Sequence, residues 1–384
     1  MKTIMPRAAE ARPELLSGNR LLAEGALEAG CRFFSGYPIT PSSEIYETMM
    51  KELPARKGLA LAAPDEITAL ALCVGASLRG YKAMTATSGP GWCLMIETVQ
   101  YAVMTETPVV VAIVQRLGPS TGGATQGAQG DVLLAEFCTS GGYTLPVFAP
   151  ATSRQCYEVA QAAFHWSERL RTPAVILSDK EIGMTLETVD TSSLANLPRT
   201  DRTSYAGDSA RFRTFASDCL EEPPPFAALG GSARVVLTGS AHDRAGRLRK
   251  NSDEVIEILT RLQRKIASHA GQMALSADEC APGADTLILS YGISARAARA
   301  ACRQLRAAGR RASFLQLLTL FPVPAEIICR AADGCSRVLV VEENLTGLYA
   351  SVLEPLLGAE RLVRVNRIGQ MITPSEIVKA AEAA

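Results

Sequence analysis

Short apolar runs alternate with longer segments of helical periodicity from Asn19 to Asp179, and this alternation limits the fold more than any other feature of the sequence. In the longer segments apolar residues recur every three or four positions, which is typical of amphipathic helices, whereas the short runs have strand length. The pattern predicts helices at 19–30, 43–53, 66–79, 92–105, 131–139 and 152–170, and strands at 32–35, 59–63, 82–86, 108–114, 145–148 and 173–178. This order is typical of an α/β domain whose parallel sheet is covered by helices on both faces.

The pattern weakens after Asp179 and then resumes as a shorter α/β unit. The proline-bearing run EEPPPFAALGG (221–231) indicates a connector. Within it we predict a helix at 252–268 that is solvated or lies across a partner, because charged residues occupy most of its faces: Glu254, Glu257, Arg261, Arg264 and Lys265. Strands follow at 285–290, 311–316, 337–341 and 362–366, with helices at 293–308, 324–332, 346–357 and 374–382. The predicted organisation is a first domain at 14–190, a connector at 191–270 and a second α/β domain at 271–384.

Composition excludes several classes of function. Lys+Arg and Asp+Glu both total 39, so the chain lacks the positive field that nucleic acid or anionic lipid requires. The longest apolar run, Ile67 to Leu78, is far shorter than the roughly 20 residues that span a bilayer. Met1 to Arg20 holds no apolar segment of signal-peptide type. The ten cysteines form no C-x-x-C pair, and the three histidines are scattered, so we expect a cytoplasmic chain without a metal site of its own.

Four loops that follow predicted strands have unusual compositions. Ligands of open α/β sheets bind beyond the C-terminal ends of the strands, so these loops are the candidate site. They are GYPITPSSE (36–44), AAPDEITAL (62–70), TATSGPGW (85–92) and QRLGPSTGGATQGAQGD (115–131).

The first loop allows two interpretations. As an ordinary helix start, Pro41 belongs to the first turn, Thr40 or Ser42 caps it, and Glu44 suits the positive helix end. That interpretation leaves Pro38 unexplained, because a second proline removes flexibility that a cap does not need to lose. The alternative is that the two prolines hold Thr40 ready for a ligand.

The other three loops also have a structural and a functional interpretation. Asp65 and Glu66 suit a helix N-terminus, but a glutamate beside an apolar run can also become a proton-transfer group. Gly89 and Gly91, after Ser88, fit either a tight turn or a close approach of the backbone to a ligand. An arginine at position 116 is either exposed on a surface loop or holds a carboxylate with its planar guanidinium.

Taken together, in this order and spacing, the four loops resemble the α subunit of 2-oxoacid:ferredoxin oxidoreductases, most closely the 2-oxoglutarate synthase branch. The resemblance continues through RTPAVILSDKEIG, LTGSAHDRAG and VEENLTGLYASVLEP, and so covers most of the chain. It implies a pyrimidine-type thiamine diphosphate-binding domain with a parallel sheet, followed by a smaller transketolase C-terminal-like α/β domain. It also implies an active site shared between subunits.

The resemblance assigns roles to individual residues. Glu66 matches the catalytic glutamate that contacts N1′ of the cofactor's aminopyrimidine. Thr40 and Arg116 match residues that bind the substrate carboxylate. The remaining positions on the cofactor side are Pro38, Ile39, Ser88, Gly89 and Gly91.

The chain contains no G-D-G motif of the kind that holds Mg²⁺ and diphosphate in thiamine diphosphate enzymes. The resemblance therefore implies a β subunit that brings the diphosphate and Mg²⁺ site and a [4Fe-4S] cluster, with γ and δ subunits as further candidates and ferredoxin as electron acceptor. The expected reaction converts 2-oxoglutarate and coenzyme A to succinyl-CoA, CO₂ and reduced ferredoxin. Alternatives are pyruvate, a branched-chain or an aromatic 2-oxoacid, for which Trp92 could line the pocket, or a non-catalytic assembly subunit.

Overall fold

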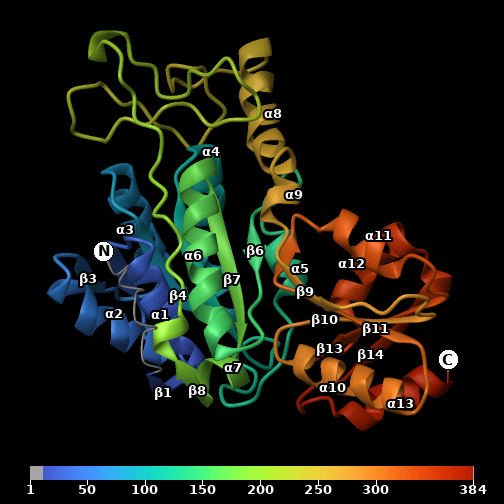
Figure 1. The fold of residues 1–384 in the computed structure, drawn as a ribbon. Coiled ribbons are helices and arrows are strands. Elements are labelled where there is room, and N and C mark those ends of the chain that lie inside the picture. Colours follow the sequence, from blue (N-terminus) through green and yellow to red (C-terminus); the bar gives the residue numbers. More distant parts are fainter. Residues whose placement is uncertain (1–11, 384) are drawn as a thin grey trace, which may run out of the picture.

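The larger of the two main sheets is centred on β5 (Val109–Gln115), whose residues are all buried (Figure 1). The computed structural model describes residues 12–383, so most of the N-terminal stretch in which we expect no signal peptide lies outside the described residues. Neighbouring strands from β7 to β3 run parallel, and β12 is antiparallel to β6. The spatial order is β12 (Thr319–Phe321), β6 (Val147–Phe148), β7 (Pro173–Asp179), β5, β4 (Ala83–Thr87), β2 (Phe33–Gly36) and β3 (Leu59–Ala62).

Helices cover both faces of this sheet, as the sequence predicts. Successive side chains of a strand point to opposite faces, and the residues of β5 divide accordingly between two cores. One core includes α1 (Gly18–Glu28), α2 (Ser43–Ala55) and α6 (Ser153–Leu170). The other includes α3 (Glu66–Leu78), α4 (Gly89–Met104) and α5 (Val132–Glu136).

The smaller sheet forms the second α/β unit. Its spatial order is β14 (Leu362–Asn366), β13 (Arg337–Glu342), β10 (Thr286–Tyr291), β11 (Ala312–Leu317) and β9 (Ser276–Glu279). One face packs against α10 (Ser294–Ala307) and α13 (Pro374–Ala383), and the other against α11 (Ala325–Ala332) and α12 (Leu348–Leu357). The core between the smaller sheet and the helices α11 and α12 is continuous with the core of α3 and α4, so the two units pack directly on each other.

The strands that sequence periodicity missed are short or lie at edges. β12 follows β11 almost directly, yet it pairs with β6 and so adds a strand from the second half of the chain to the larger sheet. β9 is antiparallel to β11, and β1 (Pro13–Ser17) forms a two-stranded ribbon with β8 (Leu186–Asp190). β1, β8 and β9 are partly exposed and lack a continuous apolar run, and β12 has only three residues. The domain boundaries at 190 and 270 stay a prediction.

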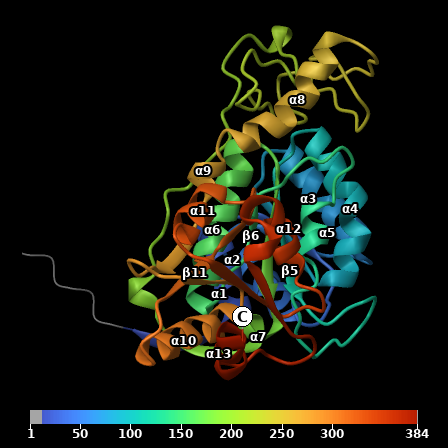
Figure 2. The ribbon, with the colours of Figure 1, turned by 90° about the vertical axis from the view of Figure 1, so that its right-hand side faces the viewer.

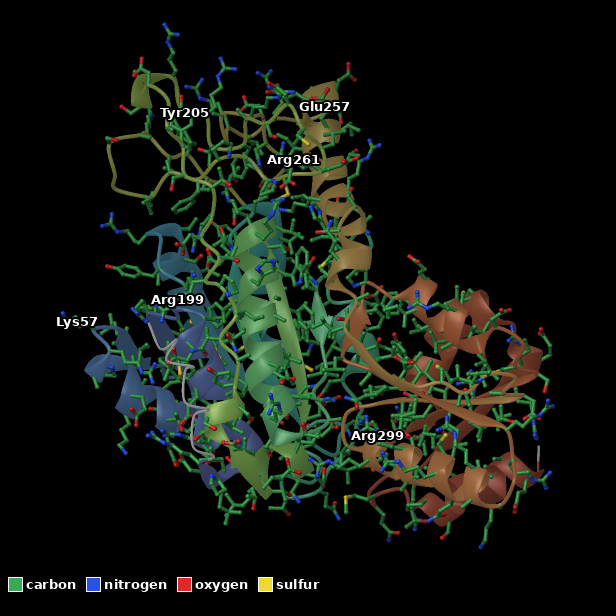
Figure 3. The ribbon with its side chains drawn as sticks, in the orientation of Figure 1. Lys57, Arg199, Tyr205, Glu257, Arg261 and Arg299 are labelled. Carbon is green, nitrogen blue, oxygen red and sulfur yellow. The ribbon has the colours of Figure 1, made fainter. Side chains whose placement is uncertain are left out.

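Most of residues 199–267, here called the arm, projects beyond the ends of α4 and α6 (Figures 1 and 2). The arm consists of long loops and α8 (Asp253–Ala267), after which α9 (Ala270–Met273) leads into the second unit. Figure 3 shows Glu257 and Arg261 on α8, with Arg261 nearer the core. α7 (Lys180–Met184) follows the C-terminal end of β7, at the end of the sheet away from the arm. No helix within residues 12–383 is long and apolar enough to cross a membrane.

The expectation that α8 is solvated on its charged faces is wrong for two residues. Arg261 and Lys265 are fully buried, and both reach the carboxylate of Glu106, at 2.8 and 3.0 Å. Lys265 also donates to the backbone carbonyl of Arg171 at 3.0 Å. Glu106 and Arg171 come shortly before β5 and β7. The arm is therefore attached at the N-terminal edge of the larger sheet, away from the loops that leave its strands.

Candidate active site

Glu66 is the first residue of α3 and lies against the first turn of α4. Asp65 caps α3, because its carboxylate accepts a hydrogen bond from the backbone N–H of Thr68 at 2.7 Å. This leaves Glu66, which is only 6% exposed, without a capping function. A Cβ atom at Gly91 would lie 2.6 Å from Oε1 of Glu66 and 2.2 Å from Oγ1 of Thr87. Gly91 is therefore required for the close approach of this turn to the carboxylate.

The same turn contains buried polar groups that lack partners. Ser88 is the N-cap residue of α4, yet its side chain makes no capping hydrogen bond. Three buried polar atoms near this turn have no hydrogen-bond partner among the described residues: Oγ of Ser88, Oγ1 of Thr85 and Nε1 of Trp92. Unpaired buried polar groups are costly, and of these three the Ser88 hydroxyl, at the start of α4, is the candidate for a ligand contact. The turn and Glu66 thus fit a polar cofactor ring.

Arg116, the first residue after β5, contacts the loop that contains Thr40. The Nη1 atom of Arg116 donates to the backbone carbonyl of Thr40 at 2.6 Å. The Arg116 side chain is largely buried, and its Nε has no partner among residues 12–383. One guanidinium edge is thus used to hold the loop, and Nε remains for a bound anion.

The GYPITPSSE loop differs in detail from the predicted helix start. α2 begins at Ser43, so Pro41 precedes the helix and does not belong to its first turn. Ser42 is the N-cap residue, but its hydroxyl donates to the carbonyl of Ile39 at 2.9 Å. Glu44 lies in the first turn and accepts a hydrogen bond from Ser17. Local capping is therefore weak, and the loop is held by long-range contacts.

The other two residues predicted on the cofactor side of this loop are less enclosed. Pro38 is exposed and Ile39 is half-buried. The first loop therefore presents a partly open surface next to Arg116. Neither residue contacts Glu66 through a hydrogen bond within the part of the chain that the structure describes.

A cavity of about 440 Å³ opens beside the first turn of α4. It is lined by this turn, by the loop after β5 and by residues of the second unit: Gly89, Pro90, Cys93, Arg116, Leu117, Gly118, Pro119, Ser120, Ala128, Gly130, Asp131, Asn344, Leu345, Thr346, Leu348 and Ile368. The prediction that Trp92 could line the pocket is wrong, because Trp92 is fully buried in the core. Arg116 is the only cationic side chain among the lining residues.

Asp131 is a site residue that the sequence did not single out. A Cβ atom at Gly89 would lie 2.8 Å from its Oδ1, and its Oδ2 is buried without a hydrogen-bond partner in the described part of the chain. Burial raises the pKa of Asp131 to about 6, and the charge of Arg116 opposes this shift. Asp131 and Glu66 thus lie against the same turn of α4, at Gly89 and Gly91.

A buried polar network fixes both ends of the loop after β5. Gln115 donates to Asp179 and accepts from the backbone N–H of Asp131, both at 3.0 Å. Gln129 donates to the other oxygen of Asp179 at 3.0 Å, and the backbone N–H of Ile293 donates to that oxygen at 2.6 Å. Burial raises the pKa of Asp179 to about 7 against these donated hydrogen bonds.

The same network joins the two units. Gln129 accepts from the backbone N–H of Glu343 at 2.8 Å and from the hydroxyl of Ser294 at 3.1 Å. The amide of Asn344 donates to the carbonyl of Gln129 at 3.2 Å. Sequence reasoning missed this network, although Gln115 and Asp179, the polar residues that end the largely apolar strands VVVAIVQ and PAVILSD, were an available signal.

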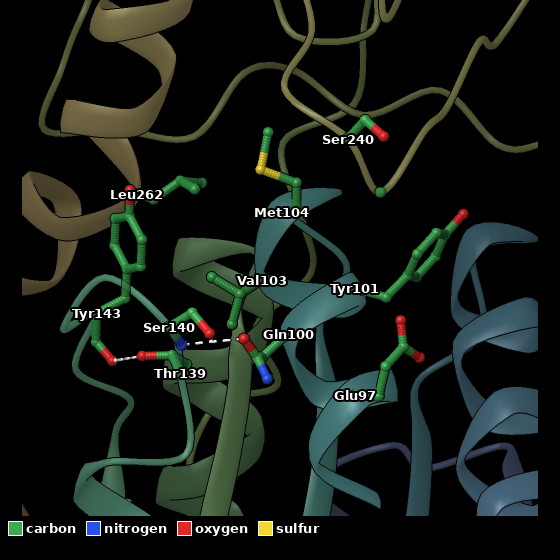
Figure 4. A pocket seen from close by; sticks show the side chains of 11 residues that line it. Glu97, Gln100, Tyr101, Val103, Met104, Thr139, Ser140, Tyr143, Ser240 and Leu262 are labelled. Carbon is green, nitrogen blue, oxygen red and sulfur yellow. Dashed lines mark hydrogen bonds between the residues drawn. The ribbon is translucent and has the colours of Figure 1, made fainter. Parts of the chain in front are cut away.

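A second cavity, of about 520 Å³, lies at the other end of α4 (Figure 4). Figure 4 shows Tyr101 and Met104 of α4 on one side and Tyr143 and Leu262 on the other. None of the predicted site residues lines it. No group of three or more His, Cys, Asp or Glu side chains that could hold a metal ion occurs among residues 12–383.

Comparisons with known proteins identify the family of the chain. A profile described as "Pyruvate flavodoxin/ferredoxin oxidoreductase, thiamine diP-bdg" matches residues 24–255, and one described as "Pyruvate:ferredoxin oxidoreductase core domain II" matches residues 284–377. The 2-oxoglutarate synthase subunit KorA of Methanothermobacter marburgensis is 37% identical over 94% of this chain and 96% of its own length. KorA of Methanocaldococcus jannaschii is 34% identical over 96% of this chain and 98% of its own.

Solved structures support the same relationship. A 2-oxoglutarate:ferredoxin oxidoreductase from Magnetococcus marinus, with 2-oxoglutarate, coenzyme A and succinyl-CoA bound, superposes with a TM-score of 0.91 at 28% identity. The match covers 97% of this chain, which spans 65% of that longer chain. A split gene transketolase shares the fold, with a TM-score of 0.58 at 15% identity. The chain therefore belongs to the pyruvate flavodoxin/ferredoxin oxidoreductase family, as a counterpart of the KorA subunits of 2-oxoglutarate synthase.

Proposed function

We propose that this chain is the catalytic α subunit of a thiamine diphosphate-dependent 2-oxoglutarate:ferredoxin oxidoreductase, which converts 2-oxoglutarate and coenzyme A to succinyl-CoA and CO₂ while reducing ferredoxin. The observation that carries the proposal is the placement of Glu66. Its buried carboxylate lies against Gly91 in the first turn of α4, and Gly89 and Pro90 of the same turn line the cavity that contains Arg116. Such an arrangement combines a proton-transfer group with an anion-binding group.

Thiamine diphosphate fits this site through its aminopyrimidine ring. Glu66 would hold the ring at N1′ and exchange a proton there, while Ser88, Gly89 and Gly91 would form the adjoining surface. When bound, the cofactor supplies a carbon nucleophile and an acceptor for the electron pair released on decarboxylation. The enclosed first turn of α4 excludes water from the carboxylate, which strengthens its interaction with the ring.

Thr40 and Arg116 would bind the substrate carboxylate that is lost as CO₂. Arg116 holds the Thr40 loop through the carbonyl contact and keeps its Nε available for the substrate. Pro38 and Ile39 would line the same approach. Arg116 is the one cationic side chain among the residues that line the cavity, so the second carboxylate of 2-oxoglutarate would need another polar partner.

The diphosphate, Mg²⁺ and a [4Fe-4S] cluster would lie on a β subunit. The sequence has no G-D-G motif, and the described residues form no metal-binding cluster. The similar proteins are named as subunits, which supports a multisubunit assembly. The proposed partners are the β subunit, with γ and δ chains as further candidates. We propose a cytoplasmic complex that transfers its electrons to ferredoxin.

The test is a comparison of the chain alone with the chain assembled with its partner subunits. We expect 2-oxoacid- and coenzyme A-dependent reduction of ferredoxin from the complex only, with 2-oxoglutarate giving a higher kcat/KM than pyruvate, 2-oxoisovalerate or an aromatic 2-oxoacid. A preference for one of the other acids would keep the chemistry and replace the substrate. A complex that is active without this chain would support the assembly-subunit alternative instead.

A further inference from the structure

The second unit forms one wall of the cavity that contains Arg116. Five of its residues line the cavity: Asn344, Leu345, Thr346, Leu348 and Ile368. Three of these side chains are apolar, and Leu345 and Ile368 are 68% and 42% exposed. Exposed large apolar side chains grouped at the mouth of a cavity are characteristic of a binding surface.

This wall is held rigidly within the second unit. The Asn344 carbonyl oxygen Oδ1 accepts from the backbone N–H groups of Gly347 and Leu348, at 2.8 and 3.1 Å. From the other side, the guanidinium of Arg364 donates to the carbonyls of Thr346 and Gly347, at 2.8 and 2.6 Å. A segment fixed from both sides keeps its side chains at a constant distance from a facing ligand.

The wall is also fixed relative to Arg116. Arg116 directly follows Gln115, which donates a hydrogen bond to Asp179 at the end of β7. Gln129 donates to the same aspartate. Gln129 also forms hydrogen bonds with Glu343 and Asn344 of the second unit. Apart from Arg116, all of these residues are at most 3% exposed. The separation between the cationic and the apolar side of the cavity is thus set by a buried network and not by mobile loops.

We infer that Leu345, Leu348 and Ile368 form the subsite for the acyl chain of the 2-oxoacid, so that the second unit determines which chains the enzyme accepts. The inference rests on the proposed function and extends it. Arg116 holds the 1-carboxylate at one side of the cavity, and the methylene or alkyl groups of the substrate lie along the apolar wall. The distal carboxylate of 2-oxoglutarate then extends past the exposed Leu345 and Ile368 towards the mouth of the cavity. Contact with such a wall favours a substrate by the burial of its methylene groups.

The test is substrate discrimination by the assembled complex carrying Leu345→Ser or Ile368→Ser. Both positions are exposed, so the substitutions should leave folding intact. Leu15→Ser and Leu248→Ser, at positions 61% and 63% exposed outside the cavity, are the matched controls. The readout is kcat/KM for pyruvate, 2-oxobutyrate, 2-oxoglutarate and 2-oxoisocaproate.

We expect the two cavity variants to lose roughly tenfold in kcat/KM for the longer acids relative to pyruvate. The loss of an apolar contact weakens the binding only of substrates whose methylene groups reach the wall. The controls should keep the wild-type ratios. Unchanged ratios in the cavity variants, or an equal fall in kcat for all four acids, would overturn the acyl-chain subsite. A wild-type complex without 2-oxoacid turnover would instead refute the proposed function, and the two failures are therefore distinguishable.

Discussion

Arg116 holds the Thr40 loop and, in the proposed function, binds the substrate carboxylate. The second of these contacts can be tested by substitution. We expect Arg116→Ala to raise KM for the 2-oxoacid roughly 10- to 100-fold, because a charge-assisted hydrogen bond contributes about 1.5–3 kcal/mol. KM for coenzyme A should not change, and Arg116→Lys should be intermediate because lysine keeps the charge without the planar fork. Arg310→Ala, at an exposed position outside the cavity, is the control. Equal effects on both substrates would exclude the carboxylate role.

Gly91 provides a steric test of the Glu66 site. An added methyl group would overlap Oγ1 of Thr87 and Oε1 of Glu66, so Gly91→Ala should displace the carboxylate. We expect kcat to fall by about two orders of magnitude, as misplacement of a reacting group by about 1 Å can cost that much. Gly271→Ala on α9, where nothing lies within 4 Å of the new atom, should keep wild-type activity. Similar kinetics of the two variants would contradict the geometry.

The candidate site could be predicted from sequence only where a motif carried it. The loops SGPG and PDEI supplied Gly91 and Glu66, which lie against each other in the structure. The role of Arg116 stays a proposal. Asp131 and Gln129 were missed, because their importance comes from contacts with Gly89, Asp179 and Glu343 that are distant in the chain. The isolated loops allowed a structural and a functional interpretation, and the functional one, which the resemblance favours, stays a proposal.

At the scale of secondary-structure elements, long helices and central strands were predictable because periodicity is strongest there. α2, α6, β5 and β7 lie within a few residues of their predicted bounds. β12 and α8 show where periodicity fails. The pairing of β12 with β6 is a long-range event, and two charged residues of α8 are buried because Glu106, far away in sequence, compensates their charge.

The arm gives a stability test of that compensation. Although burial opposes ionisation, Lys265 and Arg261 hold the pKa of Glu106 at about 2. Glu106→Gln leaves these cations buried without a counter-charge, which typically costs about 3–5 kcal/mol. Glu158→Gln breaks an exposed pair with Arg154 and should cost less than about 1 kcal/mol. Chemical denaturation measures both, and equal losses would contradict a buried anchor.

The junction between the two units gives a pH test. Burial, with the neighbouring Asp179 carboxyl, raises the pKa of Glu343 from 4.5 to about 8. The folded chain therefore binds this proton more tightly than the unfolded chain, and the resulting stability is complete below pH 4.5 and is lost as pH rises through 8. The slope contributed by one proton is at most about 1.4 kcal/mol per pH unit.

Glu343→Gln cannot titrate and should keep its hydrogen bond from the backbone N–H of Ile372. We expect the free energy of unfolding of this variant to fall less steeply between pH 6 and pH 8 than that of the wild type. Denaturant titrations of both chains at each pH provide the measurement. Parallel curves would show that Glu343 does not bind its proton more tightly in the folded state.

At the scale of the whole molecule, the candidate active site and the attachment of the arm lie at opposite edges of the larger sheet. The loops at the C-terminal edge of the larger sheet form the site together with the second unit, and the arm is attached at the opposite edge. The site contains a proton-transfer group and one anion-binding group but no cluster of metal-binding side chains among residues 12–383. Its chemistry is therefore proposed to depend on what a partner subunit supplies.

The most direct test of this account is the effect of Glu66→Gln on CO₂ release from the 2-oxoacid by the assembled complex. Glutamine keeps the size of the side chain and removes its capacity to exchange a proton, so we expect the rate to fall roughly 100-fold or more while the subunits remain associated. Glu47→Gln, at an exposed position on α2, should retain the wild-type rate. Near-normal CO₂ release by an intact Glu66→Gln complex would contradict the assignment of Glu66 as the catalytic group.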